Sequence, residues 1–398
     1  MKRRKLFEQT NHLLLIGVLF LIAFCFAMFQ GDFVSWFIFY TVTPFLLYAF
    51  LLTVVPIEIV QVDRNVVPQR VNRGQNVQVT VKFRIKTLLP LLYVRAIDVE
   101  PQRSRYFYGK GKPSKLFIGG FRKEFSWTYE LVHMERGEVM FDELYVQISD
   151  LFGWINRTFE ISEEQALLVY PKIEKMRYAA IQMQYEEGAV AARYAAVKDN
   201  AVVAGVRDYQ PGDRFSAVHW KSFAKNGQLR TKEFEDRQTQ NVTLFLDRSI
   251  EANFEEAVDL TASILQTVVA NRAEIRLLSG NEIAEMSPII QSEHQLEKTM
   301  RYLATVEPNG VSIRETFMRS QLQLQKSVLL IVTGEMTASL KQVLLEGPKY
   351  ARAIICLVVV PPEAYSKHTE KRTRLSNGRV VYITPEQFES AFMEVNKP

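Results

Sequence analysis

Hydrophobic residues dominate two long stretches at the start of the chain. Residues 13–29 and 33–55 carry no charged side chain, and each is close to the roughly 20 residues that a helix needs to cross a bilayer. Only residues 30–32 separate them, which predicts a tight transmembrane hairpin over residues 1–56. Residues 27–29 offer no small-x-small cleavage site, and a second span follows at once, so two spans are favoured over a cleaved signal peptide.

Basic residues flank these two stretches on one side. Residues 2–5 are all Lys or Arg and precede the first span, while Arg64, Arg70 and Arg73 follow the second. The positive-inside rule therefore places both ends of the hairpin in the cytoplasm of a membrane-anchored protein. We expect the large remainder of the chain to face the cytosol.

An alternating pattern follows in residues 57–172 and predicts a β-sandwich-like domain. Hydrophobic and polar residues alternate over 77–83, 93–99, 124–131 and 144–148, as in half-buried strands. The run Asp150–Trp154 is interpreted as a turn with core aromatic residues. Lys110, Lys112 and Lys115 fall in a loop that is either solvated or placed against the anionic inner leaflet.

The pattern changes again after a connector over residues 173–204, which we expect to be partly helical. In residues 241–398, short apolar strands at 242–247, 274–278, 327–333 and 353–360 alternate with segments of helical periodicity. Strands that alternate with amphipathic helices predict a doubly wound α/β sheet. The expected fold class is therefore a two-helix membrane anchor followed by an α+β and an α/β part.

Composition narrows the picture further. The chain has 398 residues and 47% hydrophobic content, which is enough for two or three domains with a substantial core. Two cysteines, Cys25 and Cys356, both lie in apolar runs, so neither a disulfide framework nor a cysteine-based metal site is expected. The net charge of +5 gives no electrostatic support for nucleic-acid binding.

Residues 205–240 hold the densest polar signal. In a structural interpretation, Asp213 caps a short helix that carries Val218 and Trp220 inward, while Arg207 and Arg214 pair with acidic groups in a buried network. In a second interpretation, the clustered Arg and Lys side chains hold an anionic group such as phosphate or a carboxylate of a partner.

A third interpretation of the same segment is catalytic. His219 would act as a general base beside Ser222 or an aspartate, Asp208 or Asp213. No G-x-S-x-G elbow or comparable nucleophile context accompanies it. The three interpretations stay open at this point.

The segment also resembles a known family. Its pattern is similar to the signature of domain of unknown function family 58, carried by Arg207, Asp208, Tyr209, Gly212, Asp213, Arg214, His219, Trp220, Lys221, Lys232 and Glu233. The resemblance implies a bacterial membrane protein with two N-terminal spans, a β-rich segment and a von Willebrand factor A-like domain over residues 241–398. It also implies association with AAA-type ATPases of the MoxR group, and it supplies no proven activity.

The end of the first α/β strand resembles a degenerate von Willebrand A-type metal site. Asp247 and Ser249 stand where such sites begin, but Glu251 replaces the second serine, and no acidic residue separates Thr333 from Gly334. Asp247 and Ser249 are candidate Mg²⁺ ligands, although we expect a fold that needs no cofactor. The expected partner surface comprises Asp247, Ser249, Glu251, Thr333 and Glu335.

These features favour an interaction or adaptor protein over an enzyme. No P-loop, dinucleotide fingerprint or zinc-ligand spacing occurs in the sequence. The expected partners are a MoxR-type ATPase and the lipid bilayer. The alternative is a hydrolase or transferase that uses His219 with Asp213 or Asp208.

Overall fold

The computed structural model describes residues 2–99, 107–108, 112–179, 203–210, 218–234, 242–279, 289–315, 317, 327–346, 350–368, 374–375 and 378–396. They form two compact units. The first unit comprises Met1–Ile173 with Glu297–Glu307, and the second comprises Glu174–Leu296 with Pro308–Pro398. Both α-helices and several separate sheets are present, so the expected mixed α and β architecture is confirmed.

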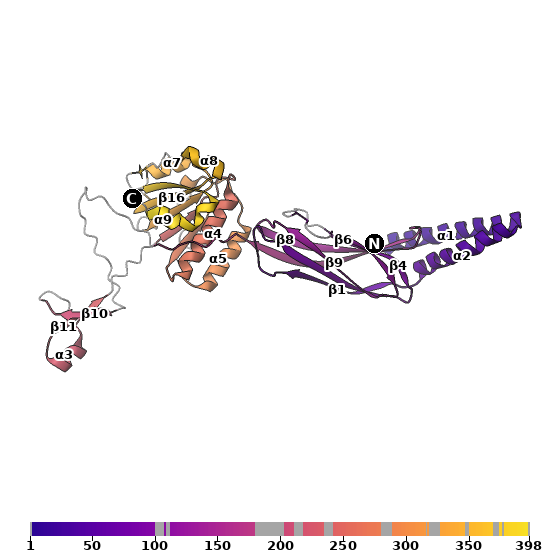
Figure 1. Cartoon of the computed structure of the whole chain (residues 1–398), viewed down its shortest axis with the longest axis horizontal. Helices are drawn as coiled ribbons and strands as arrows, with labels where there is room; N and C mark the ends of the chain where they lie inside the picture. The colour runs from indigo at the N-terminus through magenta and orange to yellow at the C-terminus, as the bar shows by residue number, and fades with distance from the viewer. Residues whose placement is uncertain are drawn as a thin grey trace. The chain divides into compact units, whose positions relative to one another are not determined.

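Two apolar helices open the first unit (Figure 1). α1 (Lys2–Gln30) and α2 (Phe33–Val54) are joined by Gly31, whose φ of 62° makes the reversal, and by Asp32, whose carboxylate accepts a hydrogen bond from the Phe33 N–H at 2.7 Å. Residues 13–30 and 33–54 are long and apolar enough to cross a membrane by length and composition. Many of their large side chains are exposed, as lipid contact requires.

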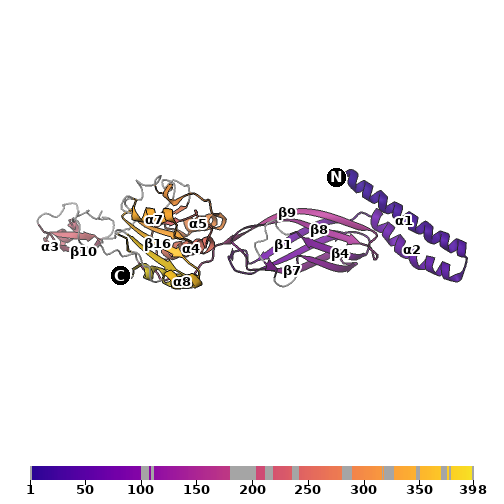
Figure 2. The same ribbon diagram turned by 90° about the horizontal axis from the view of Figure 1, so that it is seen from above.

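Nine strands follow and form two sheets (Figure 2). The first sheet has the order β1 (Glu58–Val67), β3 (Val77–Lys86), β7 (Glu124–Val132) and β5 (Phe107–Tyr108). The second has the order β2 (Val71–Asn72), β9 (Asn156–Tyr170), β8 (Gly137–Ser149), β4 (Leu91–Asp98) and β6 (Ser114–Gly120). Nearly all the pairings are antiparallel, and each strand expected in this segment is present.

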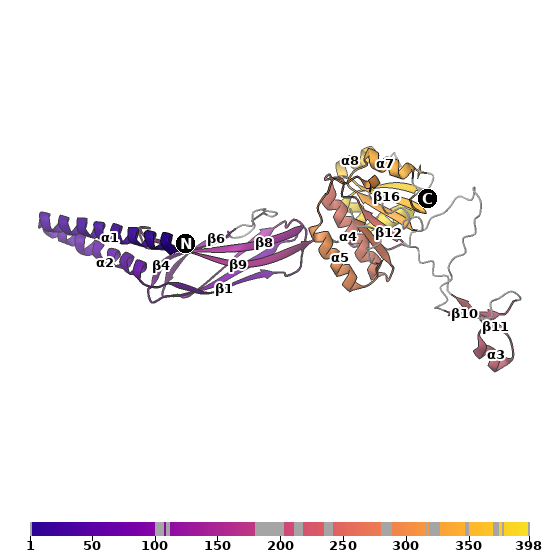
Figure 3. The ribbon, with the colours of Figure 1, turned by 180° about the vertical axis from the view of Figure 1, so that it is seen from behind.

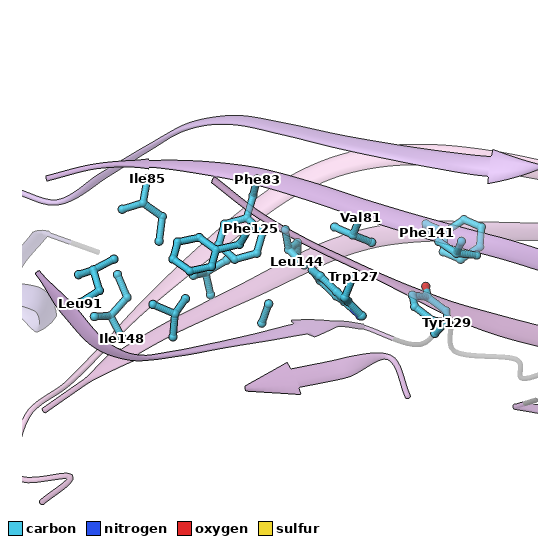
Figure 4. Packing of buried hydrophobic residues seen from close by; sticks show 14 of the residues in the cluster. Val81, Phe83, Ile85, Leu91, Phe125, Trp127, Tyr129, Phe141, Leu144 and Ile148 are labelled. Carbon is cyan, nitrogen blue, oxygen red and sulfur yellow. The ribbon is translucent and has the colours of Figure 1, made fainter. Parts of the chain in front are cut away.

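The core of this sandwich lies between the two sheets (Figure 4). Along β3, Val79, Val81 and Phe83 are buried while their neighbours are exposed or half-buried, so the alternation in the sequence corresponds to one buried face. Leu91 and Ile148 contribute to the same cluster from the other sheet. Burial of each such large side chain stabilises the fold by about 1.5–3 kcal/mol.

A charged network is buried in the sandwich. Arg64 and Asp98 form an ion pair at 2.6 Å, with side chains that are 2% and 1% exposed. The Tyr129 hydroxyl donates to the same carboxylate at 2.6 Å, and Arg64 also donates to the Glu163 carbonyl at 3.0 Å. The ion pair is thus supported by further hydrogen bonds, which buried charges require.

The C-terminal end of α2 is bonded to the sandwich. The Arg157 guanidinium, on β9, donates to the carbonyls of Leu52 and Val55 at 2.9 and 2.8 Å, so it satisfies acceptors that the helix leaves free. Burial lowers the pKa of Arg157. The Tyr48 hydroxyl, one helical turn before Leu52, donates to the Pro90 carbonyl at 2.9 Å and so connects α2 to the start of β4.

Residues of α5 (Glu293–Thr305) from position 297 onward belong to the first unit. Glu297 accepts a hydrogen bond from the Tyr170 hydroxyl at 2.9 Å and pairs with Arg70 at 3.1 Å. Burial opposes ionisation of Glu297, but the Tyr170 hydrogen bond and the charges of Arg70 and Arg301 outweigh it and lower the pKa of the carboxyl group.

The second unit contains a seven-stranded sheet. Its order is β14 (Ile289–Ile290), β13 (Ile275–Ser279), β12 (Val242–Leu246), β15 (Val328–Thr333), β16 (Ala353–Val359), β18 (Gly378–Ile383) and β17 (Arg374–Leu375). The five central strands are parallel, and the short edge strands β14 and β17 are antiparallel. The strands expected from the apolar runs are all present.

Helices cover both faces of this sheet, as Figures 1 and 3 show for α4 (Phe254–Ala270) and α7 (Ala338–Leu345). Leu329 and Ile331 of β15 pack in one cluster with Leu340 and Val343 of α7. The carboxyl half of the unit adds α8 (Pro362–His368), a 3₁₀ segment (Pro385–Ser390) and α9 (Ala391–Asn396). Of the connector at 173–204, residues 173–179 lack the helix that we expected, and 180–202 lie outside the described residues.

Candidate functional site

The ends of β12 and β15 meet at one edge of the parallel sheet. Leu246 pairs in register with Val332, so Asp247, directly after β12, lies beside Thr333, the last residue of β15. The Asp247 N–H donates to the Val332 carbonyl at 2.9 Å. The sequence-predicted residues Asp247 and Thr333 are therefore adjacent although 86 positions separate them.

The Asp247 carboxylate is buried and hydrogen-bonded at both oxygens. Ser249 donates to Oδ1 from its hydroxyl at 2.6 Å and from its N–H at 2.9 Å. Thr333 donates to Oδ2 from its hydroxyl at 3.0 Å. Asp247 is only 2% exposed, so these three donors hold a negative charge in a fixed position.

Two loops press together above this carboxylate. A Cβ added to Gly334 would lie 1.8 Å from the Ala252 carbonyl oxygen, so only glycine fits there. Asn253 adopts a left-handed conformation with φ of 51° and donates from its side chain to the Gly334 carbonyl at 3.0 Å. Glu251 and Glu335, one on each loop, are exposed at the rim.

The chemistry of this donor set fits a divalent cation only in part. Asp247, Ser249 and Thr333 could supply one carboxylate and two hydroxyl oxygens, and Mg²⁺ prefers such ligands in an octahedral set. Within the described ranges, no group of three His, Cys, Asp or Glu side chains is placed to hold a metal. Nearby Cys356 is fully buried, and burial, together with the Asp247 charge, raises the pKa of its thiol, which excludes a reactive thiolate there.

The family-like segment forms a small module, here called the signature module. β10 (Val203–Asp208) pairs antiparallel with β11 (Arg230–Phe234), and α3 (Trp220–Asn226) precedes β11. The helix begins after His219, whose side chain caps it by accepting the Ser222 N–H at 3.2 Å. The described helix is thus capped by His219, while Asp213, which we predicted as the cap of a helix here, lies outside the described residues.

Trp220 is not a core residue. Its side chain is 57% exposed, and it contacts Phe223, also exposed, edge to face with ring centroids 6.2 Å apart. Val218 is buried, as expected. The prediction that Trp220 is a core residue was wrong, because the described part of the module, a two-stranded sheet with a seven-residue helix, provides no second layer that covers the indole.

The charged residues of the signature module lie near its surface. Arg230 pairs with Asp208 at 3.3 Å, but the two side chains are 38% and 86% exposed, and Arg207 donates to the Asp208 carbonyl. Arg207 is half-buried, and Arg214, the other arginine of the buried network that we expected, lies outside the described residues, so that network stays a prediction. Lys221 is exposed, and Tyr209 and Lys232 are half-buried. Gly212, Asp213, Arg214 and the side chain of Glu233 lie outside the described residues.

His219 and Ser222 lie in contact, with 2.7 Å between Nδ1 and Oγ. A histidine beside a serine hydroxyl is one requirement of nucleophilic catalysis. The same contact follows directly from the helix cap, because residues at positions i and i+3 of a first turn are neighbours. Asp208 points to Arg230, so the described residues bring no aspartate to His219.

Comparison with known proteins identifies the family. The uncharacterized protein YeaD of Bacillus subtilis (strain 168) is 33% identical to this chain over 329 residues, which cover 82% of the chain and 83% of YeaD. The family described as protein of unknown function DUF58 matches residues 205–365. The chain belongs to the DUF58 family. In this DUF58 protein the matched region contains both the signature module and the carboxyl edge around Asp247.

Solved structures share much less with this DUF58 protein. The putative ApaA protein from Bordetella pertussis is 15% identical, covers 29% of this chain and 94% of its own, and has a TM-score of 0.18. Macromomycin is 11% identical, covers 27% of this chain and 99% of its own, and has a TM-score of 0.14. Likeness at these scores supports no statement about function.

The loop contact at the carboxyl edge contains a residue that sequence reasoning missed. Asn253 holds the loop after β12 against Gly334, and its left-handed backbone is tolerated by asparagine better than by most residues. The only signal in the sequence was its residue type. Its partner lies 81 positions away, and local patterns do not show such contacts.

Proposed function

We propose that this protein is a membrane-anchored, cytosol-facing interaction protein whose partner is an AAA-type ATPase of the MoxR group. The proposal is carried by the carboxyl edge, where the exposed Glu251 and Glu335 stand on a buried, fully hydrogen-bonded base. Fixed carboxylates on a rigid edge complement basic groups of a partner with little ordering cost.

The position of this edge in the sheet supports the proposal. From β12 the chain passes first to β13 and β14 on one side and then to β15 on the other. Ligands of open α/β sheets bind outside the carboxyl ends of the strands at such a switch point. Counted from β12, the seven strands follow the order 3-2-1-4-5-7-6, with strand 3 (β14) antiparallel. The 3-2-1-4-5 part is the order of a doubly wound sheet and supports our assignment of a von Willebrand A-like domain.

The signature module offers a second contact region for the same partner. Trp220 and Phe223 are exposed beside Lys221 and Lys225. Tryptophan and other aromatic residues are enriched at the energetic centres of protein interfaces. Trp220→Ala should therefore change the free energy of unfolding by less than about 0.5 kcal/mol while it weakens partner binding. A large loss of stability on this substitution would restore the core interpretation of the indole.

Charge reversal at the carboxyl edge tests the proposal directly. Glu251→Lys combined with Glu335→Lys should weaken capture of a purified MoxR-type ATPase, most clearly at low salt. Glu274→Lys is the matched control, because this exposed glutamate precedes β13 and lies at the opposite, amino edge of the parallel strands. Equal capture of the ATPase by the parent protein, the double variant and the Glu274→Lys control would show that the carboxyl edge is not the partner surface.

Membrane topology is tested separately. Reporters fused before Met1 and after Pro398 should both report cytoplasm if the hairpin is inserted with its basic flanks inside. A C-terminal reporter that is active only on the outer side of the membrane would contradict the cytosolic placement of the partner surface.

The alternative function, a hydrolase or transferase, is favoured by one observation, the contact between His219 and Ser222. His219→Asn separates the two roles, because asparagine is also a good helix cap but is no general base. An activity that is lost in both His219→Asn and Ser222→Ala, with the fold intact, would establish an enzyme. Loss in neither variant would leave the contact as a helix cap.

A further inference from the structure

Three turns of the sandwich lie at the same end as the membrane hairpin. Glu58, at the start of β1, pairs with Lys86, at the end of β3, so the β3–β4 turn lies where α2 joins the sandwich. Leu91 pairs with Gly120, which places the β6–β7 turn at this end as well. The β8–β9 turn is the third, because it follows Ser149, which pairs with Tyr93 of β4.

Large apolar side chains occupy the tips of these turns. Leu88 and Phe121 are 90% and 84% exposed, and Phe152 is 52% exposed. Turns of soluble proteins usually carry small or polar residues. The set that we call the apolar collar comprises Leu88, Ile118, Phe121, Leu151 and Phe152, all exposed.

The opposite end of the sandwich has a different character. The three described turns at that end carry Arg70, Arg73, Gln75, His133 and Glu135, and Val67 is the exposed large hydrophobic residue among the described side chains there. Lys112 belongs to neither end, because Ser114, two residues later, pairs with Ile97 at the level of Tyr145 in the interior of the sheet. Of the loop that we considered for contact with the inner leaflet, Lys110 lies outside the described residues, and that hypothesis stays a prediction.

The collar reaches along the membrane helix. The rings of Phe152 and Phe45 contact edge to face, with centroids 5.4 Å apart. Phe45 lies nine residues before Val54, the end of α2, which corresponds to about 14 Å along the helix axis. With α2 spanning the bilayer up to Val54, this is about half of the roughly 30 Å hydrocarbon core, so the Phe152 ring reaches in among the acyl chains.

The β8–β9 turn is built to tolerate this position. The buried Asp150 accepts hydrogen bonds from the N–H groups of Ile155 at 2.8 Å and Phe152 at 3.4 Å, and the Asn156 side chain donates to the Gly153 carbonyl at 3.1 Å. Backbone polar groups in an apolar medium need such internal partners. Each of these bonds lowers the cost of moving the turn out of water.

Charge at the collar complements an anionic bilayer. Arg122 and Lys123 follow Phe121 directly and are exposed. Basic side chains beside apolar tips are typical of segments that lie in the membrane interface, because the tips enter the acyl boundary while the cations meet lipid phosphates.

We propose that the apolar collar is a lipid-binding surface that seats the sandwich in the headgroup region of the bilayer. This inference rests on the membrane-anchoring part of the proposed function. The occupant is phospholipid and not a protein, because the collar continues the apolar surface of α2.

The test uses the full chain in nanodiscs of mixed phosphatidylcholine and phosphatidylglycerol. In a Cys25→Ser background, Leu88→Cys, Phe121→Cys and Phe152→Cys each carry an environment-sensitive fluorophore, and lipids bear a nitroxide near the ester end of the acyl chain. The buried Cys356 does not compete for label. Glu135→Cys is the matched control at the opposite end of the same sandwich, and Phe37→Cys, exposed on α2, reports insertion of the hairpin.

We expect several-fold stronger quenching and blue-shifted emission at all three collar positions than at Glu135→Cys. If the Phe152→Cys variant does not fold, quenching at Leu88→Cys and Phe121→Cys still tests the proposal. Quenching at Phe37→Cys without quenching at the collar would overturn the lipid surface and leave the anchor intact. Absence of quenching at Phe37→Cys as well would remove the membrane anchor, and the collar proposal with it.

Discussion

Thr333→Val perturbs the carboxyl edge at a single hydroxyl group, which lies 3.0 Å from both Asp247 Oδ2 and the Glu335 carbonyl and accepts the Glu335 N–H at 3.4 Å. The two side chains have nearly the same shape, so the substitution leaves no cavity. It removes the hydroxyl that donates to the buried Asp247 carboxylate at 3.0 Å. A hydrogen bond to a charged group contributes about 1.5–3 kcal/mol, and a buried acceptor without its donor carries the full cost. We expect the second unit to lose that amount of stability.

Hydrogen exchange measures this loss within one part of the chain. The slowest amides of β12 and β15 exchange through opening of the second unit, and every 1.4 kcal/mol corresponds to a factor of ten, so their exchange should be about 10- to 150-fold faster in Thr333→Val. Readout by individual amides avoids interference from the sandwich and the hairpin.

Thr261→Val is the control for this experiment. Thr261 is equally buried, but its hydroxyl donates to the Ala257 carbonyl within α4, an acceptor that the helix already uses. Loss of the Thr261 hydroxyl should lower the free energy of unfolding by less than about 0.5 kcal/mol. Equal exchange in the two variants would refute the argument that Thr333 holds Asp247, and with it the rigid base under Glu251 and Glu335.

Three further predictions concern other sites. Asp98→Asn should cost about 3–5 kcal/mol because it leaves Arg64 buried without a counter-ion, measured by denaturant unfolding with the buried Trp127 as the fluorescent probe; an unchanged midpoint would contradict the buried pair. Glu297→Gln should flatten the loss of stability as pH falls below 4.5, since a carboxyl group with a lowered pKa stabilises the fold only while ionised; parallel pH profiles of the two proteins would exclude this contribution. Mg²⁺ should not raise the melting temperature, and a rise that Asp247→Ala abolishes would show a functional metal site.

Most of the architecture could be predicted from periodicity, and the reason is physical. Alternation along β3 reports one buried face, and the apolar run of β15 reports a strand covered on both faces, so each pattern encodes its own environment. The spacing of Asp247 and Ser249 likewise placed two interacting side chains within one turn.

Predictions failed where burial depends on distant parts of the chain. An apolar residue such as Trp220 is a core residue only if another layer covers it, and no local pattern shows whether that layer exists. Phe152 was interpreted as a core aromatic for the same reason and is half-exposed. The contact of Gly334 with Ala252 joins two loops far apart in sequence, so its requirement for glycine is visible only in the folded chain.

The guanidinium of Arg157 has a mechanical consequence. The half-buried Arg157 of β9 donates hydrogen bonds to the carbonyls of Leu52 and Val55 at the end of α2, and Tyr48, in the preceding helical turn, donates one to Pro90. These hydrogen bonds hold two successive turns of α2 to the sandwich, so we expect the hairpin and the sandwich to move together. If the hairpin spans a bilayer as we propose, a change in bilayer thickness that tilts the helices should reorient the sandwich with them.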